Sequence, residues 1–294
     1  MYICMRINPR MKNKSLPHSI RVNGKLIELS SPKVMGIVNI TPDSFYSNSR
    51  AIEEREIAER VEHILNEGAD FIDIGACSSR PNATLASQEE EMKRLRKALP
   101  IIRDIAPDTA ISVDTFRSEV ASMCVEEFGV GIINDISAGE MDNNMFKTVA
   151  RLRVPYIMMH MKGTPETMQQ DANYVHLRIE LTQYFAHKIY TLQEFGVNDI
   201  ILDPGFGFGK TMAHNYELLN HLDEFQLFDL PILVGMSRKS MIYKTLGITP
   251  EESLNGTTAA NVIAMMKGAN ILRVHDVKSC VEAVKIFNTM NIHL

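Results

Sequence analysis

The chain has 294 residues, of which 45% are hydrophobic, and its formal net charge at pH 7 is −5. This length suits a single α/β barrel, and the slightly negative charge argues against a basic nucleic-acid-binding face. No apolar stretch reaches the ~18 residues that a membrane-spanning helix requires. Residues 1–17 are basic but lack an apolar core, so we expect a flexible leader rather than a secretion signal.

The four cysteines, Cys4, Cys77, Cys124 and Cys280, are scattered along the chain. No pair has the spacing of a metal-binding or redox motif. We therefore expect reduced thiols in a cytoplasmic protein.

The predicted elements begin with a β-hairpin in residues 18–32, where residues alternate in polarity around Asn23-Gly24. A repeated unit then follows: a short apolar run that ends in a polar residue, a loop, and an amphipathic helix. Rich in β-branched residues and apolar on both faces, these runs predict buried parallel strands. The eight runs are VMGIVNI, DFIDIGA, AISVDT, GIINDIS, VPYIMMH, IILDPG, PILVGM and ILRVHD.

Helices are expected at residues 53–68 and 174–196, the second ending at the C-cap signal Phe195-Gly196. After the seventh run, two helices are expected, at 238–247 and 251–268. Eight strand–helix units predict an α/β fold, a single (β/α)₈ TIM barrel spanning residues 18–294 with the hairpin at its N-terminus. An open doubly wound sheet is the alternative. The barrel is favoured because a polar residue ends every run, whereas an open sheet concentrates its site at one switch point.

The stretch IILDPGFGFGKT, residues 200–211, resembles a nucleotide-binding loop but fails its spacing. A P-loop needs glycine five positions before the glycine of Gly-Lys-Ser/Thr, and here Pro204 stands five positions before Gly209. The carboxylate of Asp203 would also repel a phosphate. We expect Lys210-Thr211 to begin the next loop, without a phosphate role.

Polar residues end all eight runs, and in a barrel these positions meet at one mouth. They are Asn39, Asp73, Asp114, Asn134-Asp135, His160, Asp203, Ser237-Arg238-Lys239 and Arg273 with His275. Helix capping stays open as an explanation for Asn39, Asp73 and Asp135.

Burying Asp114, Asn134, Asp203 and Lys239 together without partners would cost several kcal/mol, so we expect a polar ligand there. The loops after the seventh and eighth strands of a barrel often bind phosphate. Arg80, Arg273 and His275 can add charge-assisted contacts. The residues therefore predict a ligand with a donor-rich heterocyclic head and an anionic tail.

Eight segments of the chain, in order between residues 34 and 290, resemble dihydropteroate synthase. They are MGIVNITPDSFYS, DIGACSSRPNA, SVDTFR, INDISAG, MHMKGTPETMQ, LDPGFGFGKT, GMSRKSMI and GTTAANVIAMMKGANILRVHDV. The family is a transferase that joins 6-hydroxymethyl-7,8-dihydropterin diphosphate to p-aminobenzoate, releasing pyrophosphate and making 7,8-dihydropteroate for folate biosynthesis. The resemblance implies a (β/α)₈ barrel, a homodimer and Mg²⁺ as cofactor.

The resemblance also implies residue roles. The expected pterin contacts are Asp114, Asn134, Ile136, Met159, Asp203, Gly207, Phe208, Lys239 and Arg273. Diphosphate contacts are expected from Asn39, Ser79, Arg80, Arg273 and His275, with Mg²⁺ on Asn39. The p-aminobenzoate contacts are expected from Phe45, Ser79, Pro81, Phe208, Ser237 and Lys239.

The family mechanism is close to SN1, through a cationic pterin methylene. We expect Asp114 and Asp203 to stabilise that cation, and Arg273, His275 and Mg²⁺ to stabilise the departing charge. Lys239 completes the expected catalytic set.

Two loops depart from the family pattern. Tyr46-Ser47-Asn48-Ser49 replaces the usual Ser-Asp-Gly-Gly, and Cys77 stands where the family has glutamate. These departures leave p-aminobenzoate affinity and the response to sulfonamides open. Two alternative functions also remain, a non-catalytic pterin-binding paralogue and a methyltetrahydrofolate:corrinoid methyltransferase.

Overall fold

The computed structural model describes residues 18–41, 50–77, 85–168 and 172–292. Eight parallel strands form one sheet in the order β8-β7-β6-β5-β4-β3-β10-β9. The two end strands meet through a parallel bridge between Leu202 and Ile232, which brings the sheet to near closure as a barrel. These strands are β3 Lys33–Asn39, β4 Phe71–Gly75, β5 Ala110–Asp114, β6 Ile132–Asp135, β7 Tyr156–Met159, β8 Ile200–Asp203, β9 Leu233–Val234 and β10 Ile271–Val274.

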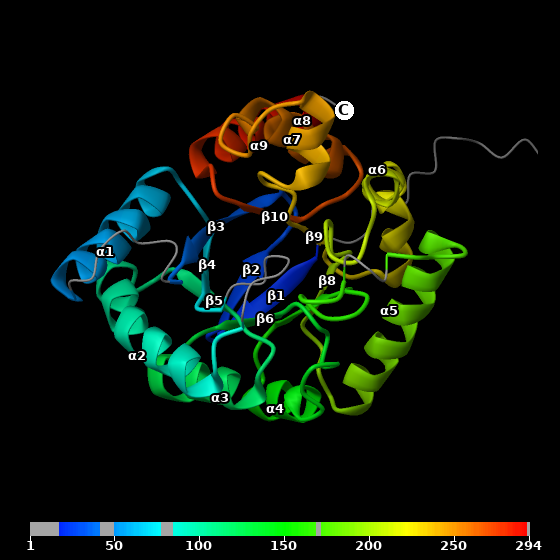
Figure 1. Cartoon of the computed structure of the whole chain (residues 1–294). Coiled ribbons are helices and arrows are strands. Elements are labelled where there is room, and N and C mark those ends of the chain that lie inside the picture. Colours follow the sequence, from blue (N-terminus) through cyan, green and yellow to red (C-terminus); the bar gives the residue numbers. More distant parts are fainter. Residues whose placement is uncertain (1–17, 42–49, 78–84, 169–171, 293–294) are drawn as a thin grey trace, which may run out of the picture.

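Helices surround the strands as an outer ring (Figure 1). They are α1 Arg50–Asn66, α2 Gln88–Ile105, α3 Ser118–Phe128, α4 Met145–Leu152, α5 Leu177–Glu194, α6 Met212–Asn220, α7 Ser240–Leu246, α8 Leu254–Met266 and α9 Val277–Ile292, with the 3₁₀ helix η2 Leu222–Phe228. The predicted TIM barrel is confirmed, including the two helices after the seventh strand. The predicted end of α5 is also confirmed, because Gly196 has a φ of +81° directly after the C-cap Phe195.

The hairpin predicted around Asn23-Gly24 is confirmed as β1 Ser19–Val22 and β2 Lys25–Glu28. Both turn residues have positive φ, 48° and 78°, as a tight two-residue hairpin turn requires. Ile20, Val22 and Leu29 pack against apolar residues near the starts of the barrel strands. In Figure 1 the hairpin lies across the middle of the ring, so it covers the barrel end opposite the strands' carboxyl ends.

No helix within the described ranges is long and apolar enough to cross a bilayer. The leader expected at residues 1–17 lies outside the described residues.

Candidate active site

The register of the parallel sheet aligns the polar strand ends. Asp114 on β5 pairs with Gly75 on one side and Asn134 on the other. On the neighbouring pair of strands, Met159 of β7 pairs with Asp203 of β8. Because parallel strands all end at the same edge, these side chains reach one mouth of the barrel.

An ion cluster centred on Arg273 lies at this mouth. Its Nε donates to Asp73 Oδ2 at 2.6 Å, and its Nη2 donates to Asp114 Oδ2 at 3.0 Å. Asn134 Nδ2 donates to the same Asp73 oxygen at 3.3 Å. The guanidinium therefore joins β10 to β4 and β5, and Asp73 links β6 to them through Asn134.

The charges of this cluster do not balance, because two carboxylates share one guanidinium. Burial raises the pKa of Asp114 to about 7, against the opposing effect of Arg273, and Asp73 raises it further. Asp73 is fully buried, and its Oδ1 is without a hydrogen bond among the described residues. Helix capping is therefore the wrong explanation for Asp73, which belongs to the site. In the sequence, the position of Asp73 near the end of an apolar run indicated a site residue, but a helix-capping residue would occupy the same position.

Asp203 and Lys239 form the opposite side of the mouth. Asp203 Oδ1 accepts a hydrogen bond from Gly205 N at 2.8 Å, and burial raises its pKa while Lys239 lowers it. The Lys239 ammonium donates to Phe206 O and lies 4.4 Å from the centroid of the Phe208 ring. Burial lowers the pKa of Lys239 to about 8, so the ammonium stays mostly protonated at pH 7 but loses its proton more readily than an exposed lysine does.

An apolar cluster lines this region. Three expected pterin or p-aminobenzoate contacts, Ile136, Met159 and Phe208, belong to it or pack against it. Cys77 packs against the same cluster. Further members are Phe116, Met161 and Met168, whose apolar character gave no signal in the sequence.

The Gly-Lys-Thr of the glycine-rich stretch has two structural roles. Lys210 is 3% exposed, and its Nζ lies 2.9 Å from His160 Nδ1, 3.0 Å from Gly205 O and 3.1 Å from Phe208 O. Thr211 is the N-cap of α6, because its hydroxyl accepts a hydrogen bond from His214 N. The two residues therefore end the loop after β8 rather than begin the next one, because α6 starts at Met212, and Lys210 anchors the turn that carries Phe208.

A second part of the site is a cavity of about 480 Å³ beside the ends of β3 and β10. Its lining includes two residues expected to bind the diphosphate, Asn39 and His275. Arg238, one of the polar residues that follow the seventh run, also lines it, together with residues that the sequence did not single out: Ile37, Glu56, Arg60 and Asp276. The glutamate and arginine of α1 were missed because amphipathic helices commonly carry such residues on their solvent-exposed face.

Two groups that were expected to make this site cationic, His275 and Arg238, contribute little net positive charge. Burial, together with Arg273, lowers the pKa of His275 to about 4, so its imidazole is neutral at pH 7. Its Nδ1 lies 3.1 Å from Ser237 Oγ, which places that hydroxyl beside the histidine. Arg238 donates to both oxygens of Asp276, at 3.0 and 2.6 Å, so its charge is largely compensated.

The oxygen donors of this cavity fit Mg²⁺. Asn39 offers an amide oxygen, and Glu56 offers a carboxylate whose Oε2 is buried with no hydrogen-bond partner in the described structure. Within the described ranges, no three His, Cys, Asp or Glu side chains form a metal cluster. Mg²⁺ is commonly held by one or two carboxylates together with substrate phosphates and water, and the oxygens of Glu56 and Asn39 are donors of the kind it prefers.

Several expected residues lie elsewhere. Phe45, Ser79, Arg80 and Pro81, and the departure at residues 46–49, lie outside the described residues. Asp135 is turned away from the ion cluster: it accepts hydrogen bonds from Ser137, Gly139 and Tyr156. Its role is to hold the turn after β6.

Comparison with known proteins agrees with this geometry. The profile of the family described as pterin binding enzyme matches residues 35–275. Dihydropteroate synthase of Escherichia coli K12 is 42% identical over 267 residues, covering 90% of this chain and 93% of the relative. The corresponding Haemophilus influenzae enzyme is 38% identical over 267 residues, covering 90% and 96%.

Solved structures give the same result. Yersinia pestis dihydropteroate synthase in a sulfonamide drug complex superposes with a TM-score of 0.85 at 39% identity, covering 93% of this chain and 99% of that one. Xanthomonas albilineans dihydropteroate synthase with 4-aminobenzoic acid gives a TM-score of 0.85 at 35% identity, covering 94% and 99%. The chain therefore belongs to the dihydropteroate synthase family of pterin-binding enzymes, which are transferases.

Proposed function

We propose that this protein condenses 6-hydroxymethyl-7,8-dihydropterin diphosphate with p-aminobenzoate, using the residues at the barrel mouth. The observation that carries the proposal is the arrangement of Arg273, Asp73 and Asp114 at the same strand ends as Asp203 and Lys239. A donor-rich heterocycle satisfies these carboxylates, and a nearby cavity accommodates an anionic tail.

The pterin is held by complementary hydrogen bonds. The carboxylate of Asp203 accepts from the 2-amino group and N3–H of the ring, while Gly205 N keeps that carboxylate oriented. Asn134 and Asp114 bind the other polar edge, and Lys239 donates to O4 and N5. Arg273 stacks on the ring. Ile136, Met159, Gly207 and Phe208 supply the apolar surroundings.

The chemical step breaks the bond between the pterin methylene carbon and the diphosphate oxygen, and the bonding pair leaves with pyrophosphate. The carboxylates of Asp114 and Asp203 stabilise the cationic methylene that develops. The arylamine nitrogen of p-aminobenzoate then attacks this carbon. Its proton passes to water or pyrophosphate, so no strong base is required.

The leaving group is bound by Asn39, Ser79, Arg80, Arg273 and His275. His275, neutral at pH 7, contributes a hydrogen bond rather than a charge. Asn39 would hold the Mg²⁺, which when bound would neutralise part of the diphosphate charge.

The p-aminobenzoate site is formed by Phe45, Ser79, Pro81, Phe208, Ser237 and Lys239. Lys239 lies over the Phe208 ring and can meet the carboxylate of this substrate. Relatives solved with 4-aminobenzoic acid and with a sulfonamide drug support a small aromatic amine as second substrate, and a sulfonamide as its competitor.

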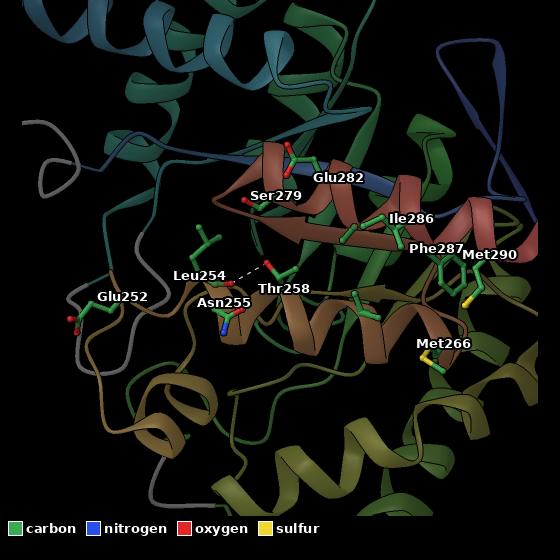
Figure 2. Close-up of a pocket in the computed structure, with 12 residues that line it drawn as sticks. Glu252, Leu254, Asn255, Thr258, Met266, Ser279, Glu282, Ile286, Phe287 and Met290 are labelled. Carbon is green, nitrogen blue, oxygen red and sulfur yellow. Dashed lines mark hydrogen bonds between the residues drawn. The ribbon is translucent and has the colours of Figure 1, made fainter.

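We also propose a homodimer formed through α8 and α9. An apolar groove of about 650 Å³ runs between these helices, and Figure 2 shows Met266, Ile286, Phe287 and Met290 along it. Met266 is 67% exposed and Ile286 is 73% exposed. Such a patch is typical of an interaction surface, and a symmetric dimer places the same patch of two copies together.

The free cysteines at positions 77, 124 and 280 fit the expected cytoplasmic location.

The deciding experiment is an assay of pyrophosphate release from the pterin diphosphate, with and without p-aminobenzoate, coupled to detection of dihydropteroate by mass spectrometry. We expect both products in equal amounts when both substrates are present. Tight pterin binding without release would instead indicate a non-catalytic paralogue.

A further inference from the structure

Glu56 lines the cavity beside β3 and β10, and its carboxylate forms no ion pair within the described part of the chain. Its Oε2 is buried and makes no hydrogen bond among the described residues. The other charged groups of this cavity are engaged: Arg238 with Asp276, and Arg60 with backbone carbonyl groups. A buried carboxylate oxygen with no partner costs free energy of folding, so its retention requires an explanation.

The position of Glu56 is fixed by the residue one helical turn further along α1. Arg60 Nη2 donates to His275 O at 2.8 Å and to Ile37 O at 3.1 Å. These bonds join α1 to the ends of β3 and β10, the strands that carry Asn39 and His275. The segment of α1 that carries Glu56 is therefore fixed beside the cavity.

The proposed function places a diphosphate in this cavity, and an unpaired carboxylate would repel that anion. A divalent cation between the two removes the repulsion. Carboxylate and amide oxygens are hard donors, which Mg²⁺ prefers, and the phosphate oxygens complete its coordination.

We propose that Glu56, together with Asn39, holds the Mg²⁺ that accompanies the diphosphate, so that the cavity selects the Mg²⁺–diphosphate complex over the metal-free anion. The inference rests on the proposed function. It adds Glu56 as a second protein ligand of Mg²⁺ to Asn39, the single ligand expected from the sequence. Glu56 acts directly on the ion or through one of its water ligands.

The test measures pyrophosphate binding by isothermal titration calorimetry, once with MgCl₂ and once with EDTA. Wild type should bind pyrophosphate more tightly with Mg²⁺. Glu56→Gln should reduce that Mg²⁺ enhancement by about tenfold, as lost metal-shell carboxylates commonly do. Its metal-free binding should be unchanged or tighter, because the repulsive charge is gone. Glu56→Asp should retain part of the enhancement.

Glu62→Gln is the matched control, because Glu62 is an exposed residue of the same helix. It should behave as wild type in both titrations. A second readout replaces Mg²⁺ with Mn²⁺ and follows the electron paramagnetic resonance spectrum of the Mn²⁺–pyrophosphate complex. Wild type and Glu62→Gln should immobilise the ion, and Glu56→Gln should release it.

The possible results distinguish a failure of the Glu56 assignment from a failure of the proposed enzymatic function. If wild type makes dihydropteroate while Glu56→Gln keeps the full Mg²⁺ enhancement, the assignment of Glu56 is overturned and the proposed function stands. If wild type neither makes dihydropteroate nor binds pyrophosphate, both are overturned. Thermal unfolding of Glu56→Gln should occur close to the wild-type temperature, because the amide has the same size as the carboxylate that it replaces.

Discussion

Arg273 is bonded to the buried carboxylate of Asp73 and to the partly buried carboxylate of Asp114, and this environment sets the protonation of Asp114. Its pKa of about 7 in the folded state lies far above the ordinary value of 3.8, chiefly because of burial. The folded state therefore binds a proton that the unfolded state does not, between about pH 4 and pH 7. Stability from this group is present below the unfolded pKa and is lost as the pH rises through about 7.

Asp114→Asn should keep the fold and lower kcat by about a hundredfold, because the amide cannot stabilise a cationic pterin methylene. In wild type, kcat/KM should rise as Asp114 ionises near pH 7. The variant should lose this acidic limb. Steady-state kinetics between pH 5.5 and 9 measure both effects.

Asp108→Asn is the control for this change, because Asp108 is exposed and forms a solvent-accessible ion pair with Lys25. Its kinetics and pH profile should match wild type. Wild-type turnover in Asp114→Asn would show that Asp114 has no part in stabilising the cation.

The turn after β8 brings several groups of the site together. Gly205 has a φ of +72°, and a Cβ there would lie 1.9 Å from His160 O, so only glycine fits. Lys210 bonds to the carbonyl groups of Gly205 and Phe208 from within the turn. Burial lowers the pKa of Lys210 to about 7, while its charge lowers the pKa of Asp203.

Lys210→Met should raise KM for the pterin substrate more than it lowers kcat, because the turn carrying Phe208 loses its anchor. It should also move the ionisation of Asp203 to higher pH, since a nearby cation is removed while Lys239 and Arg273 remain. The free energy of unfolding should fall by about 1–3 kcal/mol, because buried carbonyl oxygens lose their donor.

Kinetics as a function of pH and chemical denaturation check the Lys210→Met prediction. Lys244→Met, on the exposed face of α7, should change neither quantity. Lys210→Arg should recover part of the pH profile if the charge matters. A loss of stability with an unchanged pH profile and unchanged KM would leave Lys210 a purely structural residue.

At the scale of the whole molecule, we expect the face formed by α8 and α9 to decide whether the protein is a monomer or a dimer. Ile286→Glu should convert the proposed dimer into a monomer, because it buries a charge in an apolar interface. Light scattering coupled to size-exclusion chromatography measures this mass. Leu227→Glu is the control, since Leu227 is an exposed apolar residue on η2, away from the groove, and this variant should remain a dimer.

The sequence by itself determined the barrel and most of the pterin-binding side of the site. Eight β-branched runs alternating with amphipathic helices leave few ways to bury both faces of every strand. Each run also ends in a polar residue, and parallel strands bring those ends together. Asp114, Asn134, Asp203, Lys239 and Arg273 follow from this local pattern.

Only the tertiary structure decided how these groups are paired, because pairing joins residues far apart in the chain. It assigned Asp73 to Arg273, showed Lys210 anchoring a turn, and gave His275 an environment that removes its charge at neutral pH. Glu56 is the clearest case. Along α1 it is one glutamate among several, and only the folded chain shows that its Oε2 is buried without a partner among the described residues, on a helix that Arg60 joins to β3 and β10.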